Sequence, residues 1–165
     1  MTTVVIYHSK YGSTKRYAKF IADALGADLK DTEEASKLDF ADFEIVVLGA
    51  HLMGFAACPP MKKFLKSNKK YLIGKKIAAF LVGGTPPQLI DRNALIEKSF
   101  PEEIRRRIGA FAYYRGAMDY SRMSFGDKLV MRIASIVMPD KAKIEKFDAV
   151  KKENIKDFVA VVKKL

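Results

Sequence analysis

The sequence predicts an α/β protein built on a doubly wound parallel sheet, and three observations support this fold class. Strand and helix signals alternate along the chain, as they do in successive strand–helix–strand units. Two strand-length runs, residues 45–48 and 77–81, are apolar on both faces, like central strands of a covered parallel sheet. The length of 165 residues suits a single domain over residues 1–165, and five strands at this spacing favour the order 2-1-3-4-5.

In the first half of the chain, residues 3–8 are predicted as a strand and residues 13–25 as a helix. Apolar side chains gather on one face of this helix, at Tyr17, Phe20, Ile21, Ala24 and Leu25. Gly26 is a natural helix stop. A weaker strand follows at residues 27–30, and the polar residues 31–42 carry no clear signal beyond a short helix at 33–38.

The second half continues the alternation with apolar strands and the helices that join them. A proline in the first turn favours a helix that starts at residue 60. The remaining predicted elements are strands at residues 44–50, 76–82 and 108–115 and helices at residues 60–71, 91–107 and 148–164. No internal repeat, low-complexity tract or linker interrupts them.

The turn between the first strand and the first helix predicts a phosphate-binding site. It contains Ser9, Lys10, Tyr11, Gly12, Ser13 and Thr14. A phosphate here would meet free N–H groups at the positive end of the helix, hydroxyl donors, and a glycine that lets the backbone come close. The turn matches neither the Walker A pattern nor the dinucleotide fingerprint. An ordinary helix cap is the alternative, but the first strand-to-helix turn of a 2-1-3-4-5 sheet favours the phosphate.

This turn also carries a resemblance to a known family. The run Ile6-Tyr7-His8-Ser9-Lys10-Tyr11-Gly12-Ser13-Thr14 resembles the FMN phosphate loop of the flavodoxin superfamily, and the likeness covers essentially the whole chain. The chain is most similar to the group of menaquinone-dependent protoporphyrinogen oxidases, in its length, in Gly49-Ala50 before a loop, and in residues 109–120, which resemble that group's fifth strand. The resemblance implies a flavodoxin-like fold, FMN as cofactor, and oxidation of protoporphyrinogen with a quinone as acceptor.

By the same resemblance, the loops after the third and fourth strands, residues 50–55 and 83–87, flank the flavin ring. A flat, largely apolar ring needs apolar walls, which Leu52, Met53 and Phe55 can supply, and a few backbone donors. For residues 83–87, an ordinary turn before a helix is the alternative. The chain has no Trp, unlike electron-carrying flavodoxins that usually hold the ring between aromatics. The expected FMN-binding residues are Ser9, Lys10, Tyr11, Gly12, Ser13, Thr14, Ala50, His51, Leu52, Met53, Gly54, Gly83, Gly84 and Thr85.

Few other side chains in the sequence suggest a catalytic or metal-binding role. His51 titrates near physiological pH if unperturbed and is the candidate for proton transfer, against the alternative of a solvated loop histidine. Cys58 precedes a helix start, which can lower a thiol pKa, but a structural thiol is favoured because there is no second cysteine. The strands carry no evident nucleophile, metal-ligand cluster or carboxylate pair, so we expect no metal and a cofactor-centred mechanism.

Residues 116–140 interrupt the path from the fifth strand to the last helix and predict an inserted amphipathic helix at 124–138. Lys128, Arg132 and Ser135 fall on one narrow stripe, and the apolar remainder is too wide for packing on one small core. The alternatives for what covers this apolar face are an added layer of the domain, a second subunit in a homodimer, and an anionic membrane surface. The resemblance to the oxidase group implies that this inserted segment helps the protein to reach quinone in the membrane.

The charge bears on partners. With 30 Lys and Arg against 19 Asp and Glu, the net charge of +11 attracts anionic membranes, acidic proteins and anionic ligands such as a propionate-bearing substrate. No nucleic-acid motif is present, so no specific nucleic acid is expected. The single cysteine and the absence of a signal-like start favour the cytoplasm, with peripheral contact to the inner face of the membrane. The rival function is an electron-transfer flavodoxin that exchanges electrons with redox proteins, although such carriers are typically acidic.

Overall fold

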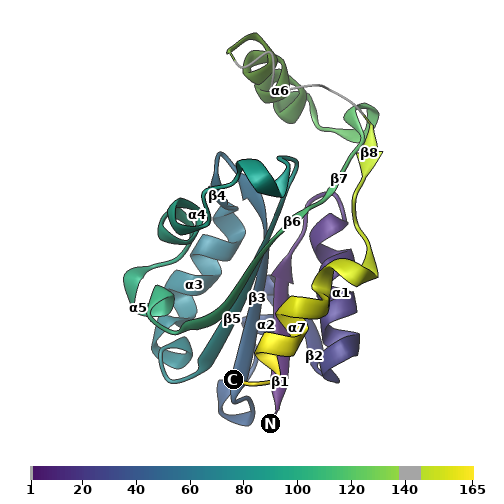
Figure 1. Ribbon diagram of the computed structural model, residues 1–165. Helices are drawn as coiled ribbons and strands as arrows, with labels where there is room; N and C mark the ends of the chain where they lie inside the picture. The colour runs from purple at the N-terminus through teal and green to yellow at the C-terminus, as the bar shows by residue number, and fades with distance from the viewer. Residues whose placement is uncertain (1, 138–145) are drawn as a thin grey trace.

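The computed structural model describes residues 2–137 and 146–165. Its main sheet has five parallel strands in the order β2-β1-β3-β5-β6, with helices on both faces (Figure 1). This confirms the expected order 2-1-3-4-5 of the principal strands and the flavodoxin-like α/β fold. The sheet strands are β1 (Thr3–His8), β2 (Asp28–Asp31), β3 (Ile45–Met53), β5 (Lys76–Gly83) and β6 (Ile108–Arg115), and the short β4 (Ala56–Ala57) pairs antiparallel with β3.

Helices cover the two faces unequally (Figure 1). Two of them, α1 (Ser13–Leu25) and α7 (Lys156–Val162), lie on one face. The other face carries α2 (Thr32–Ala35), α3 (Pro59–Leu72), α4 (Arg92–Ser99) and α5 (Glu102–Arg105). Short 3₁₀ helices occupy Phe40–Asp42, Pro87–Leu89, Tyr120–Arg122 and Lys152–Ile155.

The parallel register brings the carboxyl ends of the central strands to one edge of the sheet. His8 is paired with Ala50, His51 with Val82, and Gly83 with Arg115. Because β3 and β5 are buried on both faces, they form the centre of two apolar cores that the sheet separates. Gly49 allows this packing, since a Cβ there would lie 2.2 Å from Cζ of Phe80.

Tyr17 connects α1 to the carboxyl end of β6. Its ring is fully buried and stacks on Tyr114 with ring centroids 4.5 Å apart. The Tyr17 hydroxyl lies 3.0 Å from the carbonyl oxygen of Arg115 and 3.1 Å from that of Ala149, and it accepts from Asn154 Nδ2 at 2.9 Å. One phenol therefore joins α1, the end of β6 and the segment before α7.

Two expected helices differ from the structure. The helix expected over residues 91–107 is divided into α4 and α5, because Pro101 holds Phe100 in an extended conformation at φ −123°, ψ 137°. The last helix was expected from residue 148, but Asp148 lies in a strand, β8 (Phe147–Asp148), and α7 begins only at Lys156. The ends of these helices are therefore set by a proline and by strand pairing, and not by the helical spacing of apolar residues.

Smaller differences concern the other elements. The weak second strand is shifted by one residue, and the helix after it ends at Ala35, where it is held by a capping box between Asp31 and Glu34. The third strand runs on to Met53, so most of the loop expected at residues 50–55 is a β-hairpin with β4. Only Gly54 and Phe55 form its turn, with φ of 60° and 64°.

The insertion stands on a small sheet of its own. Strands β7 (Ala117–Met118) and β8 pair antiparallel, so the insertion extends past the expected limit at residue 140 to Phe147. Between them lies α6 (Phe125–Val137), above the carboxyl edge of the main sheet (Figure 1). Met138, the last residue of the expected helix, lies outside the described residues. No helix within residues 2–137 and 146–165 has the length and apolarity needed to cross a bilayer.

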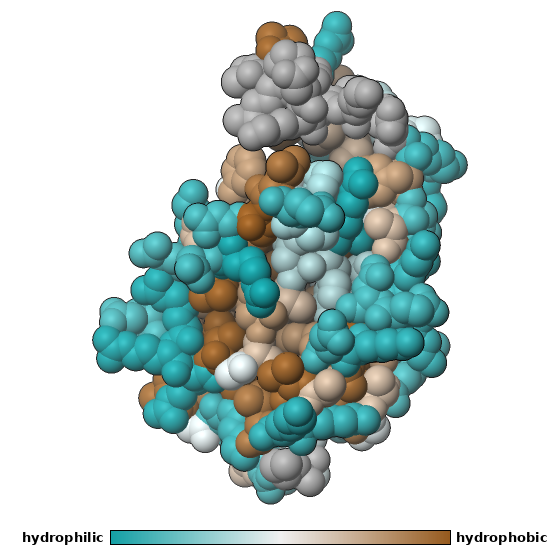
Figure 2. Space-filling view, viewed as in Figure 1, coloured by the Kyte–Doolittle hydropathy of each residue, from teal (hydrophilic) through white to brown (hydrophobic). Residues whose placement is uncertain are grey.

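At the outer edge of the main sheet, a groove of about 700 Å³ is lined by β6 together with residues 87–92 and 154–161. Figure 2 shows apolar residues gathered along this part of the surface. Arg92 reaches across the edge, where its Nη2 donates to the carbonyl oxygen of Phe111 at 2.6 Å and its guanidinium lies 5.6 Å from the ring centroid. A backbone acceptor of the edge strand is thereby occupied.

We predict that Tyr17→Phe lowers the free energy of unfolding by about 1–3 kcal/mol, because it removes the hydroxyl that contacts two partly buried carbonyls and one amide. Urea denaturation followed by circular dichroism measures the change. Tyr71→Phe is the matched control, since that side chain is exposed, and we expect a change within about 0.5 kcal/mol. Equal effects for both variants would contradict the role of the Tyr17 hydroxyl.

Candidate functional site

The candidate site lies at the carboxyl edge of the sheet, where three segments come together and two of them contact the base of the insertion. These segments are the β1–α1 turn, the β3–β4 hairpin and the turn after β5. The strand register given above places them side by side. The sequence-predicted residues of all three segments therefore gather at one edge.

The N-terminus of α1 has the features of an anion site. Gly12 precedes the helix in the left-handed region at φ 94°, and no described side chain caps the first turn. The N–H groups of that turn are therefore left for a ligand. Thr14 is 1% exposed, and its Oγ1 has no hydrogen-bond partner among the described residues. A buried hydroxyl in this state fits an acceptor-rich group, such as a phosphate, bound beside it.

Two other hydroxyls of the loop hold its shape. Ser9 Oγ accepts the N–H of Gly12 at 3.1 Å, and Ser13 Oγ accepts the N–H of Ala117 at 2.9 Å. The second contact needs a close approach by Gly116, where a Cβ would lie 3.1 Å from Ser13 Oγ. Both hydroxyls keep their own proton for donation to a ligand.

Lys10 and Tyr11 contact the insertion. Lys10 Nζ forms an ion pair of 2.7 Å with Asp127, the Tyr11 hydroxyl donates to the same carboxylate, and the N–H of Ser124 donates to the Tyr11 oxygen at 2.9 Å. The hydrogen bond from Lys10 and then that from Tyr11 lower the pKa of Asp127, and the same carboxylate raises the pKa of Lys10. These two expected phosphate ligands thus hold the first turn of α6 over the loop.

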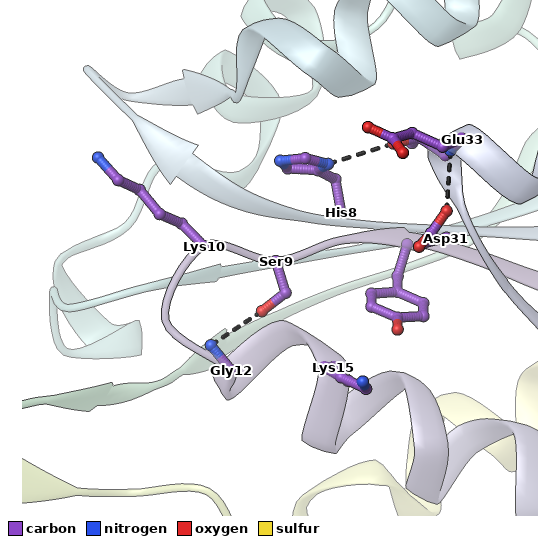
Figure 3. Close-up of a pocket in the computed structure, with 9 residues that line it drawn as sticks. His8, Ser9, Lys10, Gly12, Lys15, Asp31 and Glu33 are labelled. Atoms are coloured by element: carbon purple, nitrogen blue, oxygen red, sulfur yellow. Dashed lines mark hydrogen bonds between the residues drawn. The ribbon is translucent and has the colours of Figure 1, made fainter.

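A pocket of about 410 Å³ opens beside the loop between β1 and β2 (Figure 3). Ser9, Lys10 and Gly12 line one part of it, and Asp31 and Glu33 line another. The His8 ring points toward α2, where its Nδ1 lies 3.2 Å from Thr32 Oγ1. The carboxylates make this side of the loop unsuitable for an anion, so a phosphate fits better at the helix end beside Thr14.

The β3–β4 hairpin contributes the second wall. Ala50 is buried in the core, so only its backbone can meet a ligand, whereas Met53 and Phe55 are exposed at the tip. Leu52 is partly buried and packs on the core. Phe55 keeps a left-handed conformation that is unfavourable for an aromatic residue, and the hairpin pairing of Met53 with Ala56 enforces it. The hairpin gives the apolar surface that the sequence predicted.

The turn after β5 is braced from β6, β7 and β8. The carbonyl oxygens of Gly83, Gly84 and Thr85 accept from the Gly116 N–H (2.8 Å), Arg115 Nε (3.1 Å) and the Tyr113 hydroxyl (2.8 Å). A Cβ on Gly84 would lie 2.7 Å from Met118 Cε. These hydrogen bonds fix the conformation of the turn before any ligand binds.

Tyr113 and Arg115 lie on β6, but no sequence spacing predicts that their side chains bond to the turn after β5. Arg115 also stacks over Phe147, 3.9 Å from the ring centroid, and burial raises the pKa of Tyr113 to about 12. Asp127 gave no signal either, because it lies 116 residues from Tyr11 in the chain. Tyr113, Arg115 and Asp127 are the site residues that sequence reasoning missed.

His51 and Cys58 have perturbed pKa values for one physical reason. Burial lowers the pKa of His51, which keeps its ring neutral near pH 7, and burial raises the pKa of the Cys58 thiol. A helix start can lower a thiol pKa, but at Cys58 the loss of solvation outweighs the helix dipole. His51 Nδ1 is buried without a partner among the described residues.

The model of the flavodoxin domain family matches residues 4–154. The chain belongs to the flavodoxin-domain family. No curated protein sequence matches it.

Two solved structures share the flavodoxin-domain fold of this chain. A flavoprotein from Lactobacillus acidophilus NCFM in complex with FMN has a TM-score of 0.55 at 17% identity, over 68% of this chain and 92% of that chain. Oxidised flavodoxin 2 from Bacillus cereus has a TM-score of 0.51 at 21% identity, over 70% of this chain and 84% of that chain. At these identities the likeness establishes the fold, whose carboxyl edge carries the loop described above.

In this flavodoxin-domain protein, the contact of Asp127 with Lys10 and Tyr11 is predicted to depend on pH. Because the pKa of Asp127 is lowered in the folded protein, the contact persists above the ordinary Asp range and is lost as pH falls through the lowered value. The backbone amide shifts of Ser124 and Asp127 in NMR spectra follow this transition.

The variant Asp127→Asn should open the contact at neutral pH. For such an exposed pair we expect about 0.5–1 kcal/mol, or roughly a 2–5-fold gain in the open fraction. Tryptic cleavage after Arg122 and Lys128 measures that gain. Glu97→Gln, which removes an exposed partner of Arg105 in a distant ion pair, is the control. Unchanged Ser124 shifts and cleavage in the Asp127 variant would show that the carboxylate does not hold the insertion.

Proposed function

We propose that the chain binds one FMN at the carboxyl edge of its sheet and acts as an FMN-dependent oxidoreductase. The observation that carries this proposal is the buried, unpartnered Thr14 Oγ1 at the uncapped start of α1, among the described residues. Family membership supports it, as does the FMN named for the Lactobacillus flavoprotein. Both the donor chemistry and the location suit a ribityl phosphate.

Each segment of the edge has a task in this proposal. The first-turn N–H groups of α1 and the hydroxyls of Ser9, Ser13 and Thr14 bind the phosphate, while residues 51–53 and 83–85 position the ring. When bound, FMN supplies the electron and hydride chemistry. The chain's own part is to orient the ring and to exclude water with Leu52, Met53 and Met118. His51 is the candidate for moving a proton, and its neutral ring is the form that can accept one.

The substrate proposed from the resemblance is protoporphyrinogen, with menaquinone as acceptor. The net charge of +11 supports an anionic, propionate-bearing substrate. The proposed quinone contact is α6, where Phe125, Val130, Ile133 and Ile136 are exposed, Phe125 to 85%. An exposed apolar helix flanked by cations suits the surface of an anionic membrane, so we place the protein in the cytoplasm at the inner face of that membrane. Steady turnover with quinone identifies the enzyme, and electron exchange with redox proteins alone identifies the rival electron carrier.

The variant Thr14→Val tests the cofactor site with two opposite readouts. We expect FMN affinity to fall roughly 10-fold, because one phosphate hydrogen bond is lost, and riboflavin affinity to stay unchanged. The flavin-free protein should gain about 1 kcal/mol of unfolding free energy, since a methyl group replaces a buried hydroxyl without a partner.

The measurements are the visible spectrum after removal of excess flavin, a flavin titration, and urea denaturation. Thr2→Val, at an exposed threonine, is the control. A wild-type protein that retains no FMN at micromolar concentrations contradicts the function itself. Equal loss of FMN and riboflavin in Thr14→Val would instead contradict the phosphate assignment.

The double variant Val130→Ser/Ile133→Ser tests the membrane contact. We expect its partition onto anionic vesicles to fall at least about 10-fold, because two apolar side chains no longer enter the interface. Menaquinone-dependent turnover in those vesicles should fall in parallel. Val161→Ser, an exposed valine of α7, is the matched control. The membrane proposal is wrong if the wild type does not bind vesicles but forms a dimer, and the double variant does not dimerise. In that case α6 is a contact between subunits.

A further inference from the structure

We propose that His8, His51 and Cys58 form a binding site for one transition-metal ion of the zinc type. Their donor atoms, one from each side chain, all lie within 4.8 Å of one another. The proposal goes beyond the FMN function: it concerns a second ligand at the same edge of the sheet, and in the metal-bound state His51 does not accept a proton.

The fold places the three residues together through strand pairing. His8 ends β1 beside Ala50, so it is next to His51 on β3, and the two rings have centroids 5.7 Å apart. Cys58 follows β4 across the hairpin from His51, where its N–H donates to the His51 carbonyl oxygen at 3.1 Å. Residues 8, 51 and 58, distant in the sequence, are thus fixed by backbone hydrogen bonds.

The separations suit a small ion after a modest adjustment. Zn²⁺ takes nitrogen at about 2.0–2.1 Å and sulfur at about 2.3 Å, so tetrahedral donors lie roughly 3.3–3.7 Å apart. The observed upper limit of 4.8 Å therefore requires a contraction of about 1 Å. The side chains of His8 and His51 are only partly buried, so they can rotate that far.

The groups around the donors also point to a ligand. Thr32 Oγ1 contacts His8 Nδ1 at 3.2 Å, so an ion would bind Nε2, and a hydrogen bond on the other ring nitrogen is typical of metal-bound histidine. His51 Nδ1 is buried with no hydrogen-bond partner in the described part of the chain. The Cys58 side chain is fully buried in the core. An ion would satisfy the orphaned nitrogen.

The donor set selects the class of ion. Two imidazoles and a thiolate favour Zn²⁺ or copper, whereas Mg²⁺ and Ca²⁺ need oxygen ligands, which the cluster lacks. On binding, the Cys58 S–H bond is replaced by a metal–sulfur bond and the proton is released to buffer. Three protein ligands leave a fourth coordination position for water or a small anion, as in zinc sites that keep an open position.

The test uses the full-length, untagged protein, free of flavin, reduced and freed of metal by a chelator. Co²⁺ is added first, and Zn²⁺ affinity is then measured by competition with a chromophoric chelator. We expect one Co²⁺ per chain, with a thiolate-to-Co²⁺ charge-transfer band and tetrahedral d–d bands that Zn²⁺ abolishes. Cys58→Ser should lose the charge-transfer band, and His8→Gln and His51→Gln should weaken Zn²⁺ binding by roughly 10–100-fold or more.

The control variant is Glu97→Gln, at an exposed carboxylate outside the cluster, which should bind as the wild type does. Circular dichroism without metal checks that each variant folds. If Cys58→Ser does not fold, the two histidine variants, at partly buried positions, decide the question. Absence of stoichiometric Co²⁺ binding in the wild type, or equal binding in all variants, overturns the proposal. FMN retention is read separately on metal-free protein, so failure of the metal site leaves the flavin proposal intact.

Discussion

The parallel pairing of β1 with β3, from Thr3 opposite Ile45 to His8 opposite Ala50, is the constraint on which the rest of the structure depends. It brings the ends of both strands to the same edge, where the start of α1 and the hairpin lie. A shift by one residue would turn Val4 and Ile6 away from their core and His8 away from Thr32. The polar edge and the two apolar cores are thus consequences of a single register.

The insertion is integrated into this edge at its base. The N–H of Gly116 donates to the Gly83 carbonyl oxygen, that of Ala117 to Ser13 Oγ, and that of Ala149 to the Gly116 carbonyl oxygen. The start of the insertion is thus bonded to two of the segments that form the site. Asp127 adds a contact from α6 itself. The same segment therefore shapes the turn after β5, restrains the β1–α1 loop, and carries an apolar face outward. A change in the position of α6 is therefore transmitted by these contacts to the β1–α1 loop.

Much of the fold could be predicted from the sequence because local signals and tertiary packing agree there. The helix Ser13–Leu25 has its expected bounds, since its apolar face, the glycine before it and Gly26 after it favour the same ends. The strand pairing of Phe147 and the hairpin at Gly54–Phe55 could not be predicted, because both depend on partners rather than on periodicity. Likewise, the role of Tyr113 and the gathering of His8, His51 and Cys58 arise only when the strands are in register. Residue type was enough to predict a phosphate site in the β1–α1 loop, whereas these contacts depend on tertiary geometry.

The contact of Arg92 with the β6 carbonyl at Phe111 has a consequence for self-association. An edge strand with open backbone groups is a template on which a second chain can extend the sheet, and such growth leads to aggregation. Here a charged side chain fills the acceptor and stacks on the neighbouring ring, so an incoming strand must first displace a guanidinium. A basic residue that contacts no proposed ligand thus disfavours pairing of this edge strand with a strand of another chain.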